Sequence, residues 1–332
     1  MTGFDQQLRT LAAAVSFTSP QQARIVNARG AARVVAVAGA RDTFSGLGAA
    51  LYEDHYCALP VEPGPPVTQD SVTQDSAAFL VALRAANPVP RRHQDGWTVT
   101  RADASGIWLV NAQQQPRFAQ LHEVVPLATA LAPGRPARLV PQRDFVTGPT
   151  GHYVICGRDI LDPQSGRQVR FYWNIAPQGA AIFLREIGTR LERRRIPFQA
   201  KVPVDPARYA RSDAGVLYLN DEDVEAAHDA IGEVYRLLRD ALRESVPLFC
   251  RALAPGLAFA ESPPTRESFG VHRCGLVAEG LITAEQRGAR DADARLAVLR
   301  QRLIAYGLDL ARLECNPTSR YPYRLDAIAE AA

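Results

Sequence analysis

The sequence has almost no lysine. Lys and Arg total 38 among 332 residues, and because Lys201 is the only lysine, the other 37 are arginines. A GC-rich genome uses Arg codons in place of Lys codons, so we expect most of these arginines to be solvated surface charges. Arginine does not lose its proton in a protein, whereas lysine can. A position that needs a neutral amine cannot accept arginine, so Lys201 is a candidate functional residue.

Long apolar runs and paired cysteines are also missing. No stretch reaches the roughly 18 apolar residues of a membrane-spanning helix, and the start, MTGFDQQLRT, lacks the pattern of a signal peptide. The five cysteines are widely spaced, without a C-x-x-C pair. We therefore expect reduced cysteines in a cytoplasmic protein that does not bind membranes.

The usual cofactor and metal motifs are absent. The chain has no G-x-x-x-x-G-K-[ST], no G-x-G-x-x-G after a strand, no H-E-x-x-H and no G-x-S-x-G. Its six histidines include no pair at i, i+4, and its formal net charge is only +3. The sequence therefore predicts no metal, no cofactor and no nucleic-acid partner.

The N-terminal third is expected to be mainly helical. Residues 1–59 are Ala-rich, and residues 77–86 form a short helical pattern that Asn87-Pro88 ends. Between them, residues 60–76 begin Pro-rich and end in a tandem VTQDS repeat, which we interpret as an exposed loop. Residues 1–95 are thus predicted to be a helical region with an exposed linker at 60–76.

Residues 96–332 are predicted to form an α+β domain with a mixed or antiparallel sheet flanked by helices. Short β-branched and aromatic runs bounded by Gly, Pro, Asp or Asn predict the strands: WTVTRA, GIWLVNA, ARLVPQR, HYVICGR, QVRFYWNI, IPFQAKVPV and GVLYLN. Apolar residues at spacings of three and four predict helices at 178–195, 221–244 and 289–306, and a buried helix follows SFGVHR. Strands and helices do not alternate regularly, which favours α+β over α/β.

Several polar residues stand inside apolar strings in this domain: Arg170, Tyr172 and Asn174 in VRFYWN, Lys201 in PFQAKV, Arg211 and Asp213 in RSDAGVLYL, and His272 and Arg273 in SFGVHRC. In order and spacing, the strings VRFYWNI, PFQAKV, RSDAGVLYLND and APGLAFAESPPTRESFGVHRCGLVAEGL resemble the HopA effector family. LYEDHYC at 51–57 and AANPVPRRHQDGW at 85–97 extend the likeness, which covers about residues 45–325 and excludes the linker.

Some members of this family are type III secretion effectors. Other members are encoded beside precursor peptides and kinases in gene clusters for class V lanthipeptides and thioviridamide-like thioamitides. The resemblance to this second branch implies a phosphoserine/phosphothreonine lyase that needs no metal. A partner kinase of the aminoglycoside-phosphotransferase type would phosphorylate Ser or Thr of the precursor peptide, and the lyase would eliminate phosphate to give dehydroalanine or dehydrobutyrine. A complex with that kinase is expected.

Such an elimination assigns roles to the embedded residues. It needs a base for the Cα proton, stabilisation of the charge that grows on the amide oxygen, and groups that hold and protonate the phosphate. A desolvated lysine can be the base, and arginine binds phosphate bidentately. The expected roles are Lys201 as base, His272 as acid, Arg170, Arg211 and Arg273 as phosphate ligands, and Tyr172 and Asn174 as groups that bind the substrate amide or the enolate.

Structural alternatives stay open for each role. Lys201, Arg170 and Arg273 could form ion pairs, His272 could be a core histidine, and Arg211 is favoured as a loop clamp paired with Asp213. One of Tyr172 and Trp173 is expected to be core, because they alternate along a strand. His152 is a reserve acid, and the arginines at 190–195 are a solvated helix end or a contact for an acidic leader peptide. A non-catalytic effector and a scaffold that presents a precursor to the kinase remain alternative functions.

Overall fold

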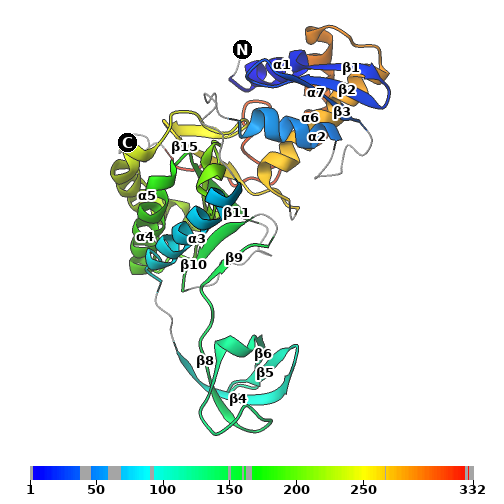
Figure 1. Ribbon diagram of the computed structural model, residues 1–332. Coiled ribbons are helices and arrows are strands. Elements are labelled where there is room, and N and C mark those ends of the chain that lie inside the picture. The colour runs from blue at the N-terminus through cyan, green and yellow to red at the C-terminus, as the bar shows by residue number, and fades with distance from the viewer. Residues whose placement is uncertain are drawn as a thin grey trace. The chain divides into compact units, whose positions relative to one another are not determined.

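The chain folds into two compact units, of which the larger holds residues 1–87 and 146–332 and the smaller holds residues 88–145 (Figure 1). The computed structural model describes residues 3–37, 46–58, 69–89, 93–148, 151–158, 161, 167–265, 267–325 and 328, with only the backbone of 69–75. The predicted boundary between residues 95 and 96 does not coincide with this division. A small sheet with its own core is inserted between two parts of the larger unit.

The centre of the larger unit is a seven-stranded sheet in the order β14-β15-β11-β13-β12-β10-β9. Neighbouring strands from β14 to β10 pair antiparallel, as expected. Their bounds are β9 (Asp144–Val146), β10 (His152–Cys156), β11 (Gln168–Trp173), β12 (Gln199–Pro203), β13 (Gly215–Asn220), β14 (Arg251–Ala254) and β15 (Leu257–Glu261). Together with the helices, this sheet confirms the α+β class.

Two helices cover one face of the central sheet. α4 (Pro177–Arg194) begins with proline in its first turn and ends where Arg195 adopts a left-handed conformation at φ 58°. It packs against α5 (Val224–Leu238). Trp173 is fully buried against Phe183 of α4 at a centroid distance of 5.4 Å. Because neighbouring strand residues point to opposite faces, Tyr172 lies on the other side of the sheet.

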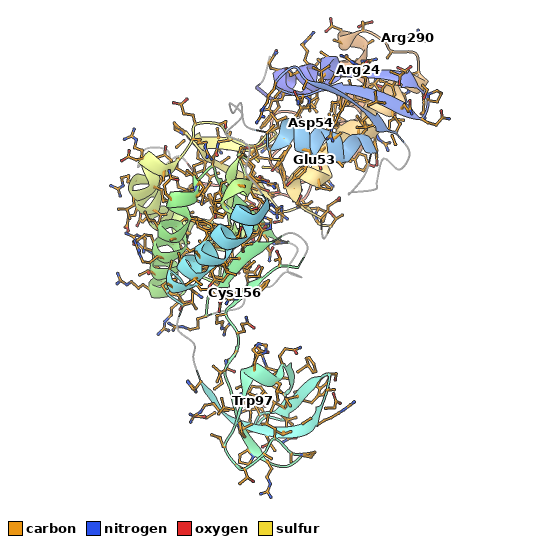
Figure 2. The ribbon with its side chains drawn as sticks, viewed as in Figure 1. Arg24, Glu53, Asp54, Trp97, Cys156 and Arg290 are labelled. Atoms are coloured by element: carbon orange, nitrogen blue, oxygen red, sulfur yellow. The ribbon has the colours of Figure 1, made fainter. Side chains whose placement is uncertain are left out.

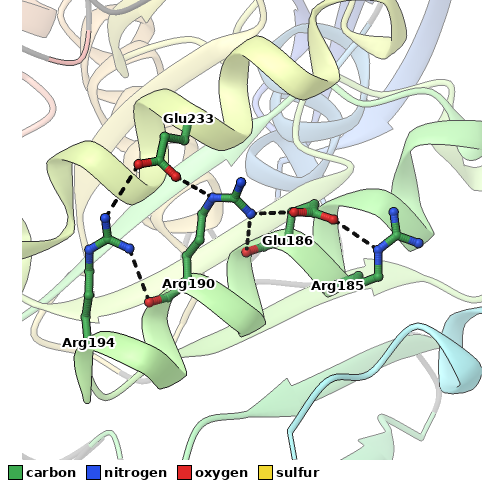
Figure 3. A network of polar contacts seen from close by, with 5 residues as sticks. All are labelled: Arg185, Glu186, Arg190, Arg194 and Glu233. Carbon is green, nitrogen blue, oxygen red and sulfur yellow. Dashed lines mark hydrogen bonds and ion pairs between the residues drawn. The ribbon is translucent and has the colours of Figure 1, made fainter.

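Part of the arginine run at 190–195 joins these two helices. Arg190 donates hydrogen bonds to the carboxylates of Glu186 and Glu233, at 2.7 Å to the latter, and Arg194 lies 3.6 Å from Glu233 (Figure 3). Glu186 also accepts from Arg185 at 3.0 Å. Two arginines of the run therefore already form ion pairs with glutamates of this protein, and an acidic leader peptide would have to compete with those glutamates.

The second face of the sheet is covered by segments from both ends of the chain, namely α2 (Gly46–Leu51), the π-helix Tyr52–Tyr56 and α6 (Phe269–Gln286). α7 (Ala292–Ala305) packs against α6, and α1 (Gly3–Ala14) packs against α7. Tyr172, Val216 and Ala258 of the sheet join Leu51, Phe269 and Leu281 in one buried core. In the part of the chain that the structure describes, no helix is both long and apolar enough to cross a membrane.

The N-terminal region contains a sheet that the helical expectation did not include. β1 (Val15–Ser19), β2 (Gln22–Val26) and β3 (Ala32–Ala36) form an antiparallel meander. Its alternating apolar residues, among them Ala23 and Ile25, are buried, and Asn27–Gly30 forms the turn before β3. This short period-two pattern is hidden in the sequence by the high alanine content, which favours helix.

The VTQDS repeat is mostly helical. α3 (Gln69–Ala85) begins within the first copy and continues through the segment predicted as a short helix at 77–86. Residues 60–68 of the predicted linker lie outside the described residues. Only the Pro-rich start of that linker is incompatible with a helix, because the repeat itself contains neither proline nor glycine.

The smaller unit is a five-stranded antiparallel sheet in the order β6-β5-β4-β8-β7. Its strands are β4 (Gln94–Asp103), β5 (Gly106–Val110), β6 (Pro116–Ala119), β7 (Val124–Pro126) and β8 (Pro136–Leu139). Val99, Leu109 and Leu139 are central to its core, and Trp97 of β4 packs against them (Figure 2). The strands predicted at WTVTRA, GIWLVNA and ARLVPQR are confirmed.

Candidate functional site

A cavity of about 600 Å³ opens over the face of the central sheet that bears Tyr172. Its floor comes from β10 to β13, and its walls come from the π-helix Tyr52–Tyr56 and the N-terminus of α6. The charged or titratable side chains on its lining are Tyr52, Glu53, Tyr56, His152, Arg170, Tyr172, Lys201, Arg208, Arg211, Asp213, Tyr218 and Glu267. Four of the seven predicted site residues, Lys201, Tyr172, Arg170 and Arg211, are among them.

Strand register brings these side chains together. Lys201 of β12 and Tyr172 of β11 both lie opposite Val216 of β13, and Arg170 lies opposite Tyr218. Residues directly opposite in an antiparallel pair share a face of the sheet, and so do residues two apart on one strand. Lys201, Tyr218, Arg170 and Tyr172 therefore line the same side.

Lys201 lies against Tyr218. Its Nζ is 5.5 Å from the centre of the Tyr218 ring. Among the described residues, no carboxylate comes within ion-pair distance of this ammonium. Burial opposes ionisation of the Tyr218 phenol, but Lys201 and Arg170 outweigh it and lower the pKa of Tyr218. The alternative that Lys201 is half of a surface ion pair has no support in this geometry.

Arg170 is a buried cation near the same ring, with its guanidinium carbon 5.2 Å from the ring centre. It comes from β11, whereas Lys201 comes from β12 on the opposite side of β13. Its Nε donates to Ser262 Oγ at 2.9 Å and one Nη donates to the carbonyl of Glu267 at 3.3 Å. It has no carboxylate partner in the described part of the chain. Burial alone would lower the pKa of Arg170, but the neighbouring tyrosines raise it, so the side chain stays charged.

Arg211 is held by an acidic partner. It donates two hydrogen bonds to Asp213, one of them at 2.9 Å, and a third to Tyr52 Oη at 2.7 Å. Burial favours the protonated form of Asp213, but Arg211 outweighs this effect and keeps the pKa of Asp213 below its usual value. The predicted pairing of Arg211 with Asp213 is therefore present, and it fastens the loop before β13 to the π-helix.

His152 lies at the start of β10 on the cavity wall. Burial, followed by the positive charges of Lys201, Arg208 and Arg211, lowers the pKa of His152 to about 3. Its imidazole is consequently neutral near pH 7. Burial is the larger cause, and the three positive charges add to it, so the cavity has a positive potential that favours anions.

His272 and Arg273 lie outside the cavity lining. Arg273 is buried, with Nε donating to the carbonyl of Leu313 and one Nη to that of Cys315, each at 2.9 Å. Its other Nη lies 2.7 Å from His272 Nδ1. Burial is the main reason that the pKa of Arg273 falls to about 10 and that of His272 to about 4. Arg273 anchors the C-terminal segment to α6, so the expected phosphate contact is not supported.

Asn174 is also away from the cavity. It is fully buried beyond the end of β11, and its Nδ2 donates to the carbonyl and hydroxyl oxygens of Ser245 at 2.8 and 2.9 Å. Its amide therefore holds the loop after α5 and has no path to a bound peptide. The alternation of Tyr172 with Trp173 is resolved as expected, because Trp173 is core and Tyr172 lines the cavity.

Sequence reasoning missed Tyr218, Arg208 and the two tyrosines of the π-helix, Tyr52 and Tyr56. A signal for Tyr218 existed, since it lies in the string GVLYLN and alternates with apolar residues. The strand β13 carrying it is central and buried on both faces, so the alternation did not mark one face as polar. No cluster of three His, Cys, Asp or Glu side chains suited to a metal occurs in the ranges that the structure describes.

The central sheet and the cavity above it define an α+β protein with a cationic pocket. Residues 149–314, half of the chain, match the model of the HopA1 effector protein family, and the chain belongs to this family. No curated protein matches the sequence.

Solved structures that are similar to this chain include two effector proteins of Pseudomonas syringae. The one from pv. tomato strain DC3000 is 19% identical, with 77% of this chain and 85% of that chain covered and a TM-score of 0.46. The one from pv. syringae strain 61 is 16% identical, with coverages of 78% and 86% and a TM-score of 0.45.

Proposed function

We propose that this protein is a carbon–oxygen lyase that eliminates phosphate from phosphoserine or phosphothreonine of a ribosomally made precursor peptide, leaving dehydroalanine or dehydrobutyrine. The observation that carries the proposal is the presence of two basic side chains without carboxylate partners, Lys201 and Arg170, in one cavity of the described structure. A buried guanidinium such as that of Arg170 is costly without a counter-ion, and an anionic ligand compensates for that cost.

Three requirements of the elimination have side chains in the cavity: the phosphate ligands, the base and the group that stabilises the enolate. Arg170 and Arg208 would hold the phosphate oxygens, because guanidinium groups bind them in forked geometry. Lys201, in its neutral form, would remove the Cα proton from the substrate residue. Tyr172, whose ring lies beside Arg170, would face the amide oxygen that gains charge as the proton leaves.

The proposal includes a partner kinase of the aminoglycoside-phosphotransferase type that supplies the phosphorylated peptide. A phosphorylated intermediate is better transferred between bound enzymes than released. The partner would be tested by size-exclusion chromatography of the two purified proteins at micromolar concentration. Co-elution supports a complex, and strictly separate elution contradicts this part of the proposal.

The activity test uses the full chain with synthetic phosphoserine and phosphothreonine peptides, alone and with the candidate kinase, and measures free phosphate and the dehydrated product by mass spectrometry. We expect Lys201→Arg and Lys201→Ala to lower phosphate release by about 1,000-fold, within the range of a removed proton-transfer group. Arg194→Lys, on the outer side of α4, is the matched control and keeps wild-type activity.

Two outcomes oppose the proposal. If Lys201→Arg keeps full activity, the requirement for a neutral amine is wrong. If the wild type releases no phosphate from any phosphopeptide, even with the kinase, the alternative of a non-catalytic effector or scaffold stands. That alternative has its own support in the family to which the chain belongs, since the family is named for effector proteins.

A further inference from the structure

The proposed elimination needs an acid, because a phosphate ester leaves easily only when its bridging oxygen gains a proton. His272, the acid expected from the sequence, is not on the cavity lining. The proton donor is therefore sought among the phenol and imidazole groups that do line it, because the aliphatic hydroxyls of Thr147 and Ser268 are much weaker acids. The phenol and imidazole groups are those of Tyr52, Tyr56, Tyr172, Tyr218 and His152.

The contacts of the four tyrosine hydroxyls show which of them is best suited to donate a proton. Tyr52 Oη donates to Asp213 at 3.2 Å and accepts from Arg211, and Tyr56 Oη lies 3.8 Å from Cys250 Sγ. Burial raises the pKa of Tyr172, which makes its phenol a poorer acid. Tyr218 differs from all three, since its ring lies between Lys201 and Arg170.

We propose that Tyr218 is the general acid of this site, giving its phenolic proton to the departing phosphate oxygen and recovering one from Lys201. The inference rests on the lyase activity proposed above. It makes Tyr218 a catalytic residue that the sequence did not suggest, and it makes Lys201 and Tyr218 one proton-transfer pair.

The protons balance within the pair. The reaction starts with Lys201 as a neutral amine and Tyr218 as a phenol. Lys201 takes the Cα proton, the Cα–H electron pair becomes the new Cα=Cβ bond, the Cβ–O bond breaks, and Tyr218 protonates the leaving oxygen. Hydrogen phosphate departs, leaving an ammonium beside a phenolate. Transfer of one proton from Lys201 to Tyr218 restores both groups without a proton from solvent.

The surroundings of Tyr218 suit this cycle. Lys201 on β12 and Arg170 on β11 flank the ring, and the lowered pKa of Tyr218 shows that these cations stabilise its phenolate. Asp213, before β13, acts weakly in the opposite sense. The remaining charged groups on the cavity lining are Glu53, Arg208, Arg211 and Glu267. His152 is the competing acid, but its pKa of about 3 leaves almost no protonated imidazole near pH 7.

The decisive experiment varies the leaving group. Sulfate is a much weaker base than phosphate, so elimination from an O-sulfoserine peptide needs no acid, whereas elimination from the matching phosphoserine peptide does. We expect Tyr218→Phe to lower phosphate release by about 100-fold or more, while sulfate release falls by less than about 5-fold. Lys201→Ala loses both reactions. Tyr235→Phe is the matched control, because Tyr235 lies on α5 and its hydroxyl donates a hydrogen bond to the carbonyl of Pro255.

The outcomes distinguish this inference from the proposed function. A wild type inactive on both peptides overturns the lyase itself. An active wild type whose Tyr218→Phe variant loses both reactions equally, or neither, overturns the role of Tyr218 alone. If His152→Gln shows the phosphate-selective loss instead, His152 is the acid.

A pH profile decides the same point if the wild type rejects the sulfate ester. Wild-type kcat/KM for the phosphopeptide should fall at alkaline pH as Tyr218 ionises and can no longer donate. Tyr218→Phe should lack this alkaline fall. An unchanged alkaline fall in the variant contradicts the proposal.

Discussion

The ammonium group of Lys201 lies 5.5 Å from the centre of the Tyr218 ring, on a neighbouring strand of the central sheet. The two positions are 17 residues apart in the sequence and separated by a loop and a short 3₁₀ turn. Arg170 of β11, the strand on the opposite side of β13, adds a second basic group near the same titratable phenol. The site proposed for this protein is centred on that relationship.

Arg170→Gln is expected to weaken phosphopeptide binding without a comparable effect on the unphosphorylated peptide. A charge-assisted hydrogen bond contributes about 1.5–3 kcal/mol, which corresponds to a Kd increase of roughly 10- to 100-fold. Isothermal titration with both peptides measures the difference, and Arg324→Gln, at an exposed arginine paired with Glu225, is the control. Equal Kd values for the phosphopeptide in wild type and Arg170→Gln would assign Arg170 a purely structural role.

Arg273→Met is expected to destabilise the protein and leave phosphopeptide affinity unchanged. The variant keeps apolar volume but leaves the carbonyls of Leu313 and Cys315 without their donors. Each of the two unsatisfied buried groups costs about 1–3 kcal/mol, so the free energy of unfolding should fall by about 2–6 kcal/mol. Urea denaturation and peptide titration on the same sample test both halves. A large loss of affinity at unchanged stability would instead support the phosphate contact expected from the sequence.

His152 is expected to make the folded state sensitive to acid. Because folding lowers the pKa of His152 from about 6.5 to about 3, protonation favours the unfolded chain. Its contribution to stability is complete above pH 6.5 and is lost as pH falls toward 3. At pH 4.5 the loss relative to pH 7 amounts to about 3 kcal/mol.

The measurement compares wild type with His152→Asn by urea denaturation at pH 7 and pH 4.5. The difference in unfolding free energy between the two pH values should be smaller in the variant by about that amount. Parallel pH dependence in the two proteins would show that the cavity does not hold His152 in its neutral form.

Gly270→Ala is expected to disturb the cavity wall. A Cβ at this position would meet Cε1 of Tyr56 at 2.3 Å, and Tyr56 is fully buried. Overpacking of this kind costs about 1–3 kcal/mol. Gly48→Ala on α2 meets only ordinary contacts from 3.5 Å outward and is the matched control, with a gain of roughly 0.5–1 kcal/mol from helix propensity. Thermal unfolding of both variants measures the contrast, and a neutral Gly270→Ala would show that Tyr56 can move.

Much of the architecture follows from local pattern. β-branched and aromatic runs such as HYVICGR and GVLYLN become strands β10 and β13 because their side chains suit a pleated, buried surface. α4 and α7 follow from apolar spacing and end where expected within a few residues. The N-terminal meander and the start of α3 could not be predicted from local pattern. The high alanine content of residues 1–59 suggested helix where the meander lies, and the prolines of the linker suggested a loop where α3 begins.

The amino-acid sequence alone is enough to place one lysine in an apolar strand among many arginines, and to show that VRFYWN, PFQAKV and SFGVHR carry polar residues in apolar contexts. Which of these residues come into contact depends on the folded chain. Strand register places Lys201, Arg170 and Tyr218 on one face of the sheet. Arg273 instead donates hydrogen bonds to the carbonyls of Leu313 and Cys315. A local pattern specifies burial, but the partner of a buried charge comes from distant parts of the chain, and its position depends on how they pack.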